Sequence, residues 1–180
     1  EEYTETLTIG RTEGDMTYVK YKEQVFKVLS DIISFANDSS YNIVSKLQAL
    51  VDISEVKSVT VEYNGAEHTI DITHNDSDMT FVLDGQKVDT KITQAIYKSI
   101  VGLAVDGVYK DETLGDTVMR IKYKGIKSSS DTEIEFKSID DLYCALIRNG
   151  KTEFTIKKSK LNEFMDLFNT YVENPEKQGD

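Results

Sequence analysis

A seven-residue pattern occurs twice in this chain, and it constrains the fold more than any other feature. Residues 59–65 read VTVEYNG and residues 119–125 read MRIKYKG. Both stretches alternate apolar and polar side chains, place a tyrosine fifth and end in glycine. Strict alternation is typical of a strand with one buried face, and a glycine directly after it indicates a turn. The sequence therefore predicts that one strand-and-turn module is used twice.

Similar alternation covers most of the chain. Each alternating stretch is rich in Val, Ile, Thr, Tyr or Phe, which favour a pleated, half-buried surface. The pairs Asn64-Gly65, Asp84-Gly85 and Asn149-Gly150 predict tight hairpins and antiparallel pairing, because these residues accept a positive φ. The predicted strands are Thr6–Ile9, Thr17–Tyr21, Val25–Val28, Val59–Tyr63, Glu67–Thr73, Met79–Leu83, Val118–Tyr123, Thr132–Phe136, Leu142–Ile147 and Thr152–Ile156.

Helices are predicted where apolar residues recur at helical spacing. Two longer helices are expected near residues 91–104 and 160–172, and a shorter helix from Ser30. The segment 41–51 fits a helix, although its last residues also fit a strand. The residues expected to cap or end the two longer helices are Asp89 or Thr90, Gly107 and Ser159.

The order of these elements predicts an α+β fold. Strand, turn, strand, strand and helix follow one another in residues 56–110 and again in residues 111–180. A shorter β-rich version with a helix occupies residues 1–55. We expect a mainly antiparallel sheet with helices packed on it, built from two or three related β-β-β-α units. With 180 residues, of which 39% are hydrophobic, the chain is long enough to form one compact body.

The charge of the chain limits its partners. The net charge of −11 argues against binding to nucleic acid or to anionic lipid headgroups, which both attract Lys and Arg. No apolar run reaches the ~20 residues that a membrane-spanning helix needs. The chain begins at Glu1 without an initiator Met, so we expect any membrane contact to come from an anchor upstream. No cofactor is predicted.

Both histidines lie in one polar segment, residues 68–78, together with three aspartates. These residue types suggest a metal site, but the strand pattern argues against one. In a strand, His68 and His74 would share a face and lie about 20 Å apart, too far to bind one ion. We therefore assign no metal ligands and leave open whether either histidine has more than a structural role.

No motif for catalysis or nucleotide binding is present. The chain lacks a Gly-x-Ser-x-Gly elbow and a glycine-rich phosphate loop. Cys144 lies in the apolar run DDLYCALI, which predicts a buried, inert thiol. Tyr63 and Tyr123 occupy matching positions, and half-buried strand tyrosines with hydroxyls at the rim are expected there; a ligand-stacking platform is the alternative. No catalytic or cofactor-binding residue is assigned.

The strand and helix patterns resemble a known bacterial family. The stretches that carry the resemblance are TLTIG, TYVKY, QVFKVLSDIISF and DISEVKSVTVEYNG. They look like the repeating body of the domain-of-unknown-function family numbered forty-three forty, which is common in Firmicutes. The resemblance implies an extracytoplasmic body, tethered by an N-terminal membrane helix, in an auxiliary component of an ABC-type transporter. The family has no established catalytic residues, so none is carried over.

The chain is thus predicted to be a non-catalytic, membrane-tethered, extracytoplasmic accessory module that acts through a protein partner. Such a module needs an apolar patch or a free strand edge on its surface. One alternative is a binding protein for a small ligand, peptide or cell-envelope glycan, which needs a deep cleft near Tyr63 or Tyr123. A second alternative is a hydrolase, which needs His68 or His74 in a pocket beside a carboxylate or hydroxyl.

Overall fold

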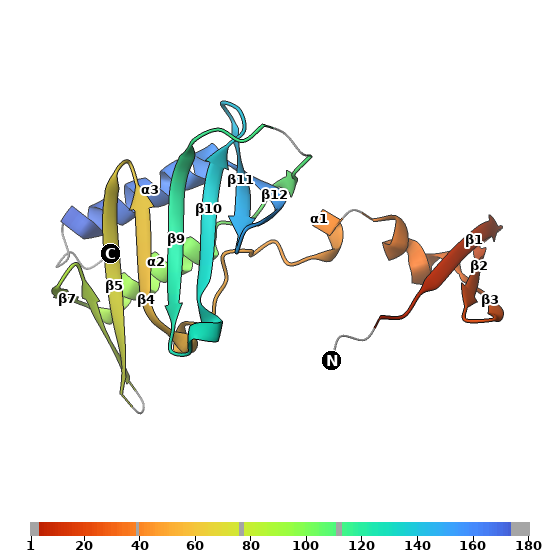
Figure 1. Cartoon of the computed structure of the whole chain (residues 1–180), viewed down its shortest axis with the longest axis horizontal. Coiled ribbons are helices and arrows are strands. Elements are labelled where there is room, and N and C mark those ends of the chain that lie inside the picture. The colour runs from red at the N-terminus through yellow and green to blue at the C-terminus, as the bar shows by residue number, and fades with distance from the viewer. Residues whose placement is uncertain (1–3, 39, 76–77, 111–112, 174–180) are drawn as a thin grey trace. The chain divides into compact units, whose positions relative to one another are not determined.

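The chain forms two compact units, which are described separately (Figure 1). The computed structural model describes residues 4–38, 40–75, 78–110 and 113–173. We call Glu1–Val44 the N-terminal unit and Ser45–Asp180 the C-terminal unit. The division between the units comes before the boundary expected after residue 55. The boundary expected after residue 110 lies inside the C-terminal unit, because one sheet contains strands from before and after that residue. The three related units of the sequence analysis stay a prediction.

The N-terminal unit is a three-stranded antiparallel meander in the order β1-β2-β3, followed by a 3₁₀ helix. The Ser30 hydroxyl lies 2.9 Å from that of Thr17, so the helix starts on the Thr17 face of the sheet. On that face Val19 and Ile33 are buried. The elements are β1 (Leu7–Glu13), β2 (Met16–Tyr21), β3 (Gln24–Leu29), η1 (Ser30–Asn37) and a short α1 (Ser40–Ile43).

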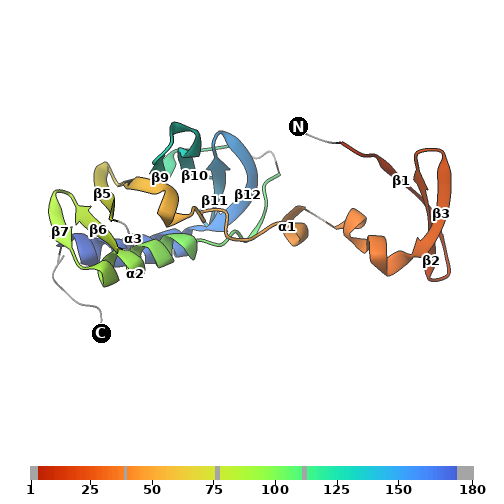
Figure 2. The same cartoon turned by 90° about the horizontal axis from the view of Figure 1, so that it is seen from below.

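The C-terminal unit contains a nine-stranded antiparallel sheet in the order β7-β6-β5-β4-β9-β10-β11-β12-β8. Two helices lie side by side on one face of this sheet (Figure 2). The elements are η2 (Ile53–Glu55), β4 (Val56–Tyr63), β5 (Ala66–Asn75), β6 (Asp78–Leu83), β7 (Gln86–Val88), α2 (Thr90–Val101), β8 (Gly107–Val108), β9 (Thr117–Gly125), η3 (Ser128–Ser130), β10 (Thr132–Ser138), β11 (Tyr143–Arg148), β12 (Lys151–Lys157) and α3 (Lys158–Glu173).

The two copies of the seven-residue pattern lie next to each other at the centre of this sheet. They form β4 and β9, which pair antiparallel. The start of each copy of the pattern faces the end of the other copy, and the two middle residues, Val61 and Ile121, face each other. A two-fold axis between Val61 and Ile121 would relate the two copies in this way. The register is Val59 with Tyr123, Val61 with Ile121 and Tyr63 with Met119.

Tight turns hold the hairpins in register, as predicted from the Asn-Gly and Asp-Gly pairs. Both residues of each pair have positive φ, which matches the twist of the flanking strands. The φ angles are 50° and 76° at Asn64 and Gly65, 49° and 82° at Asp84 and Gly85, and 49° and 78° at Asn149 and Gly150.

The two longer predicted helices are present with small differences at their ends, whereas in the segment 41–51 only the residues of the short α1 are helical and no strand follows. Asp89 caps α2, because its Oδ1 accepts a hydrogen bond from the Lys91 N–H at 2.7 Å. The helix ends at Gly102 and not near Gly107, which begins β8. Ser159 is not the N-cap of α3, because that helix starts one residue earlier, directly after β12. The helix expected from Ser30 is a 3₁₀ helix.

The core of the C-terminal unit lies between the sheet and the two helices. Alternate residues of β4 and β9 point into it, together with apolar residues of α2 and α3. The fold is therefore α+β with a mainly antiparallel sheet, as predicted. None of the helices among the described residues has the length and apolar character needed to cross a bilayer.

Candidate functional site

The two histidines lie on the helix-facing side of β5, and each has its own partner. His68 Nδ1 lies 2.7 Å from Asp84 Oδ2, and Asp84 also accepts a hydrogen bond from the Thr69 N–H. His74 donates from Nε2 to the Val56 carbonyl at 2.7 Å. His68 therefore lies beside a carboxylate, as the hydrolase alternative requires, whereas His74 lies beside a backbone carbonyl. Both contacts also join β5 to its neighbours.

The pockets described in the C-terminal unit have no histidine in their linings. Four pockets of 310–390 Å³ are described, near the lower end of the ~300–1,000 Å³ typical of ligand sites, and neither histidine lines any of them. Among the described residues no three His, Cys, Asp or Glu side chains gather as a metal site would require. Residues 76–77 of the histidine segment lie outside the described part of the chain.

Cys144 and the two repeated tyrosines are core residues. Cys144 is fully buried, and burial raises the pKa of its thiol, which disfavours the nucleophilic thiolate. Tyr63 and Tyr123 are also buried, and not half-buried as expected, because the helices cover both rings. The Tyr123 hydroxyl donates to the Ala49 carbonyl at 3.0 Å, and the Tyr63 hydroxyl donates to Asn169. Both rings are thus mostly covered, although Tyr63 lines a pocket of 320 Å³ and Tyr123 lines one of 390 Å³.

Charged side chains form a connected network on the sheet face opposite the helices. Arg120 of β9 lies between its cross-strand neighbours Glu62 and Glu135, with nitrogen–oxygen distances of 2.9 and 2.7 Å. Lys122 also contacts Glu62, and Lys137 lies 3.8 Å from Glu135. Positive and negative groups alternate, so the network neutralises itself and offers no uniform charge to a ligand.

The network changes the protonation of its carboxylates. The ammonium of Lys122 lowers the pKa of Glu62, and Arg120 adds to this effect against the cost of burial. Burial acts to raise the pKa of Glu135, but hydrogen bonds from Thr117 and Arg120 outweigh it and lower that pKa. Both carboxylates therefore stay charged near neutral pH and act as structural anions.

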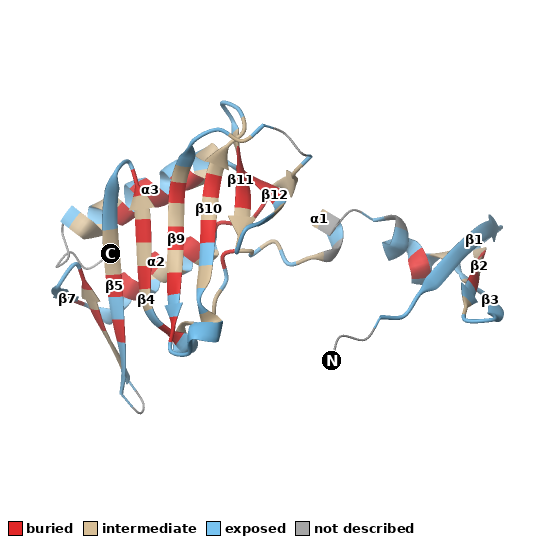
Figure 3. Ribbon diagram, in the orientation of Figure 1, coloured by how far each residue is buried: buried red, intermediate tan, exposed pale blue. Residues whose placement is uncertain are grey.

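Much of the N-terminal unit is exposed (Figure 3), and apolar side chains are among the exposed residues on both faces of its sheet. On the inner face, which carries η1, Leu7, Ile9 and Phe26 are exposed around the buried Val19. On the outer face, Val25 is 65% exposed and Leu29 is 48% exposed. Exposed apolar side chains that gather on a small sheet are typical of an interaction surface.

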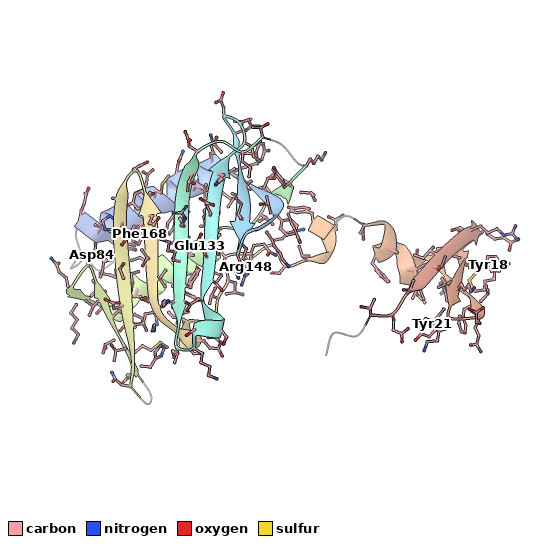
Figure 4. All side chains as sticks on the ribbon, viewed as in Figure 1. Tyr18, Tyr21, Asp84, Glu133, Arg148 and Phe168 are labelled. Carbon is pink, nitrogen blue, oxygen red and sulfur yellow. The ribbon has the colours of Figure 1, made fainter. Side chains whose placement is uncertain are left out.

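The outer face also carries aromatic and basic groups. Tyr18 pairs with Lys27 across β2 and β3, and the Lys27 ammonium lies 5.3 Å from the Tyr18 ring centroid (Figure 4). The Arg11 guanidinium lies 5.5 Å from the same ring. Val25 and Leu29 flank Lys27 along the same face, because side chains alternate in a strand. We call Tyr18, Val25, Lys27 and Leu29 the outer patch.

The free edge of β1 is the third feature of this unit. β1 pairs only with β2 among the described residues, so its other edge presents unpaired backbone groups. An exposed edge can accept a further strand by main-chain hydrogen bonding. The N-terminal unit therefore combines a free strand edge with exposed apolar side chains.

Sequence reasoning predicted the strands but missed these surfaces and the charged network. Alternation places Glu62 and Arg120 away from the core, yet nothing in the sequence states that β4 lies beside β9. The apolar residues of β1 and β3 read like any buried strand face. No family model, no curated protein and no solved structure matches this chain.

Proposed function

We propose that this chain is a non-catalytic interaction module that acts through a protein partner. Following the resemblance stated above, the partner is an ABC-type transporter complex, and the module is an extracytoplasmic auxiliary component tethered by an anchor outside this chain. The observation that carries the proposal is the outer patch, where Val25 and Leu29 are exposed on either side of Lys27, and Tyr18 lies across from Lys27.

The outer patch limits the chemistry of the partner. Its apolar side chains favour burial against another apolar surface. Arg11 and Lys27 stand over the Tyr18 ring, in a chain whose net charge is −11. Glu13 already pairs with Lys27. A partner surface with apolar side chains and a carboxylate that faces Arg11 would complement both features.

The non-catalytic part of the proposal has separate support. Cys144 is buried, and His68 and His74 are held by structural partners away from the described pockets. The ligand-binding alternative has less support, because Tyr63 and Tyr123 are buried and the pockets that they line reach only 320 and 390 Å³. Replacing both histidines with Ala is expected to leave the cellular role intact; loss of the role in a folded variant would favour the hydrolase.

We further propose that the chain is built from two or three related β-β-β-α units. The central register of β4 and β9 supports this idea, since matching residues are exchanged across the pair. The mirrored strand order on either side of this pair, from β4 to β7 and from β9 to β12, supports it as well. A repeated scaffold without a polar cleft suits recognition by surface.

The proposed partner can be tested by crosslinking in native membranes. The full-length tagged protein, expressed in its own cells, is crosslinked, purified and read by mass spectrometry. A double variant with Val25→Glu and Leu29→Glu removes the outer patch, and Leu142→Glu is the matched control because Leu142 is exposed in the C-terminal unit.

We expect transporter permease or ATPase subunits with the wild type and with Leu142→Glu, and their loss with the double variant. Equal recovery with the double variant would contradict the role of the outer patch. Recovery of no transporter subunit above an unrelated anchored control would overturn the proposed partner itself.

A further inference from the structure

The meander of the N-terminal unit repeats the strand pairing of β5, β6 and β7. In both meanders three apolar residues, one from each strand, face one another across the sheet and form a cross-strand row. In the neighbouring row, the third strand contributes a glutamine. The rows are Ile9, Val19 and Phe26 with Leu7, Tyr21 and Gln24, and Ile72, Phe81 and Val88 with Ile70, Leu83 and Gln86. A helix follows each meander, η1 in one case and α2 in the other.

The two meanders differ in how their rows are covered. Ile72 and Val88 are each 6% exposed, whereas the corresponding Ile9 and Phe26 are 38% and 43% exposed. The meander in the C-terminal unit has two additional neighbours. β4 pairs with the free edge of β5, and α3 arrives from the other half of the sheet.

One side chain of α3 shows how this helix covers the β4–β7 half of the sheet. Phe168 of α3 packs against the Tyr63 and His68 rings, with centroid distances of 6.0 and 5.7 Å. These rings belong to β4 and β5, which lie across the central pair from β12 and α3. The half of the sheet from β4 to β7 is therefore completed by a strand, β9, and a helix, α3, from the opposite half.

The N-terminal unit has the surfaces that such a partner would use. β1 has a free edge among the described residues, and Leu7 and Ile9 are exposed beside it. η1 exposes Ile32 and Phe35, which have no apolar cover of their own. A body of roughly 40 residues buries too little surface for a robust fold, and association commonly supplies the rest.

We propose that a second copy of this chain covers the inner face of the N-terminal unit. The two β1 strands pair antiparallel about a two-fold axis through Leu7–Ile9, ahead of the register shift that follows Ile9. The η1 helix of each copy lays Ile32 and Phe35 over Leu7 and Ile9 of the other. Within one chain, β9 and α3 cover the half of the sheet that β4 belongs to. In the proposed dimer, β1 and η1 of one chain cover the N-terminal unit of the other chain in the same way. It leaves the outer patch free for the proposed partner and does not depend on that partner's identity.

Sedimentation velocity of the purified chain tests the proposal. The wild type is expected to form a concentration-dependent dimer. Ile9→Glu places a charge in the contact and is expected to weaken the dimer by at least about tenfold. Val25→Glu on the outer face and Leu142→Glu in the C-terminal unit are the matched controls, and both are expected to dimerise like the wild type.

A wild type that stays monomeric at its highest attainable concentration would overturn the proposal. So would a folded Ile9→Glu variant, checked by circular dichroism, with unchanged dimer affinity. If the wild type is monomeric, thiol labelling of Ile9→Cys identifies the occupant: protection points to the same chain, and ready labelling points to a different protein.

A cysteine scan along β1 provides a test that leaves the inner face unchanged. A two-fold antiparallel pair brings one residue next to its own copy, and the separation grows in both directions from there. Thr6→Cys, Thr8→Cys and Arg11→Cys are therefore expected to crosslink most efficiently at Thr8, while native Cys144 stays buried. Equal crosslinking at all three positions, or none, would contradict the paired β1 strands.

Discussion

The β1–β3 and β5–β7 meanders share their pairing and differ in their environment. Both place apolar side chains on one face and end in a helix, yet one face is buried and the other is open. The comparison separates two contributions to a β-sheet protein. Local alternation determines which face is apolar, whereas distant strands and helices determine whether that face is removed from water.

The largest expected effect contrasts the matching isoleucines of the two meanders. Ile72→Ala leaves a cavity in a closed core and is expected to lower the free energy of unfolding by about 2–5 kcal/mol. Ile9→Ala removes a side chain that is already partly in water, so the monomer is expected to lose less than about 1 kcal/mol.

Urea titration followed by amide NMR signals in each unit measures the two losses separately, because the units need not unfold together. Equal losses under conditions in which the chain is monomeric would show that the inner face is already covered. In that case the contrast between the meanders would not hold.

A second contrast concerns two tyrosine hydroxyls. Tyr123→Phe leaves the buried Ala49 carbonyl without its donor and is expected to destabilise the C-terminal unit by about 1–2 kcal/mol. Tyr18→Phe removes an exposed hydrogen bond to Glu13 at 2.9 Å, where water replaces it, and is expected to change little. Thermal unfolding measured for each variant would contradict the assignment if the order of the two effects were reversed.

The charged network predicts a dependence on pH. The pKa of Glu62 is lowered in the folded chain, so its contribution to stability is complete above the ordinary pKa of about 4.3. The contribution is lost as the pH falls through the lowered pKa. We therefore expect the wild type to be more stable than Glu62→Gln at neutral pH, with a difference that shrinks on acidification. Chemical unfolding across this range measures the difference, with Glu163→Gln on α3 as control; a constant difference would exclude the network as its source.

The smallest effect is expected for the exposed ion pair of the N-terminal unit. Lys27 lies 3.3 Å from Glu13, and both side chains are largely solvated. Lys27→Gln is expected to change the free energy of unfolding by less than about 0.5 kcal/mol. A larger loss in urea titration would mean that the pair is shielded from water, and hence that the outer patch is already covered.

Much of the fold could be predicted because its determinants are local. Alternation located ten strands, and Asn64-Gly65, Asp84-Gly85 and Asn149-Gly150 identified turns that the structure confirms. The short strands β7 and β8 were missed, since two or three residues carry too little pattern. Ser159 was misassigned because α3 begins without the interval that an N-cap would occupy.

The candidate surfaces could not be predicted, because they depend on which distant strands and helices cover each sheet face. A local sequence pattern does not contain that information. Ile9 and Ile72 have similar neighbours in sequence, and only the arrival of β4 and α3 distinguishes them. Arg120 and Glu62 are likewise brought together by a pairing between distant strands. The register of β4 with β9 is the observation that sequence periodicity could not supply.

Hydrogen exchange read by mass spectrometry tests the central contrast most directly. Amide protection would be measured in β1 and in β4 over a range of protein concentrations. We expect β4 to stay protected throughout, while β1 is weakly protected in dilute solution and gains protection as the concentration rises. Strong and concentration-independent protection of β1 would show that its edge is already covered, and would contradict the account.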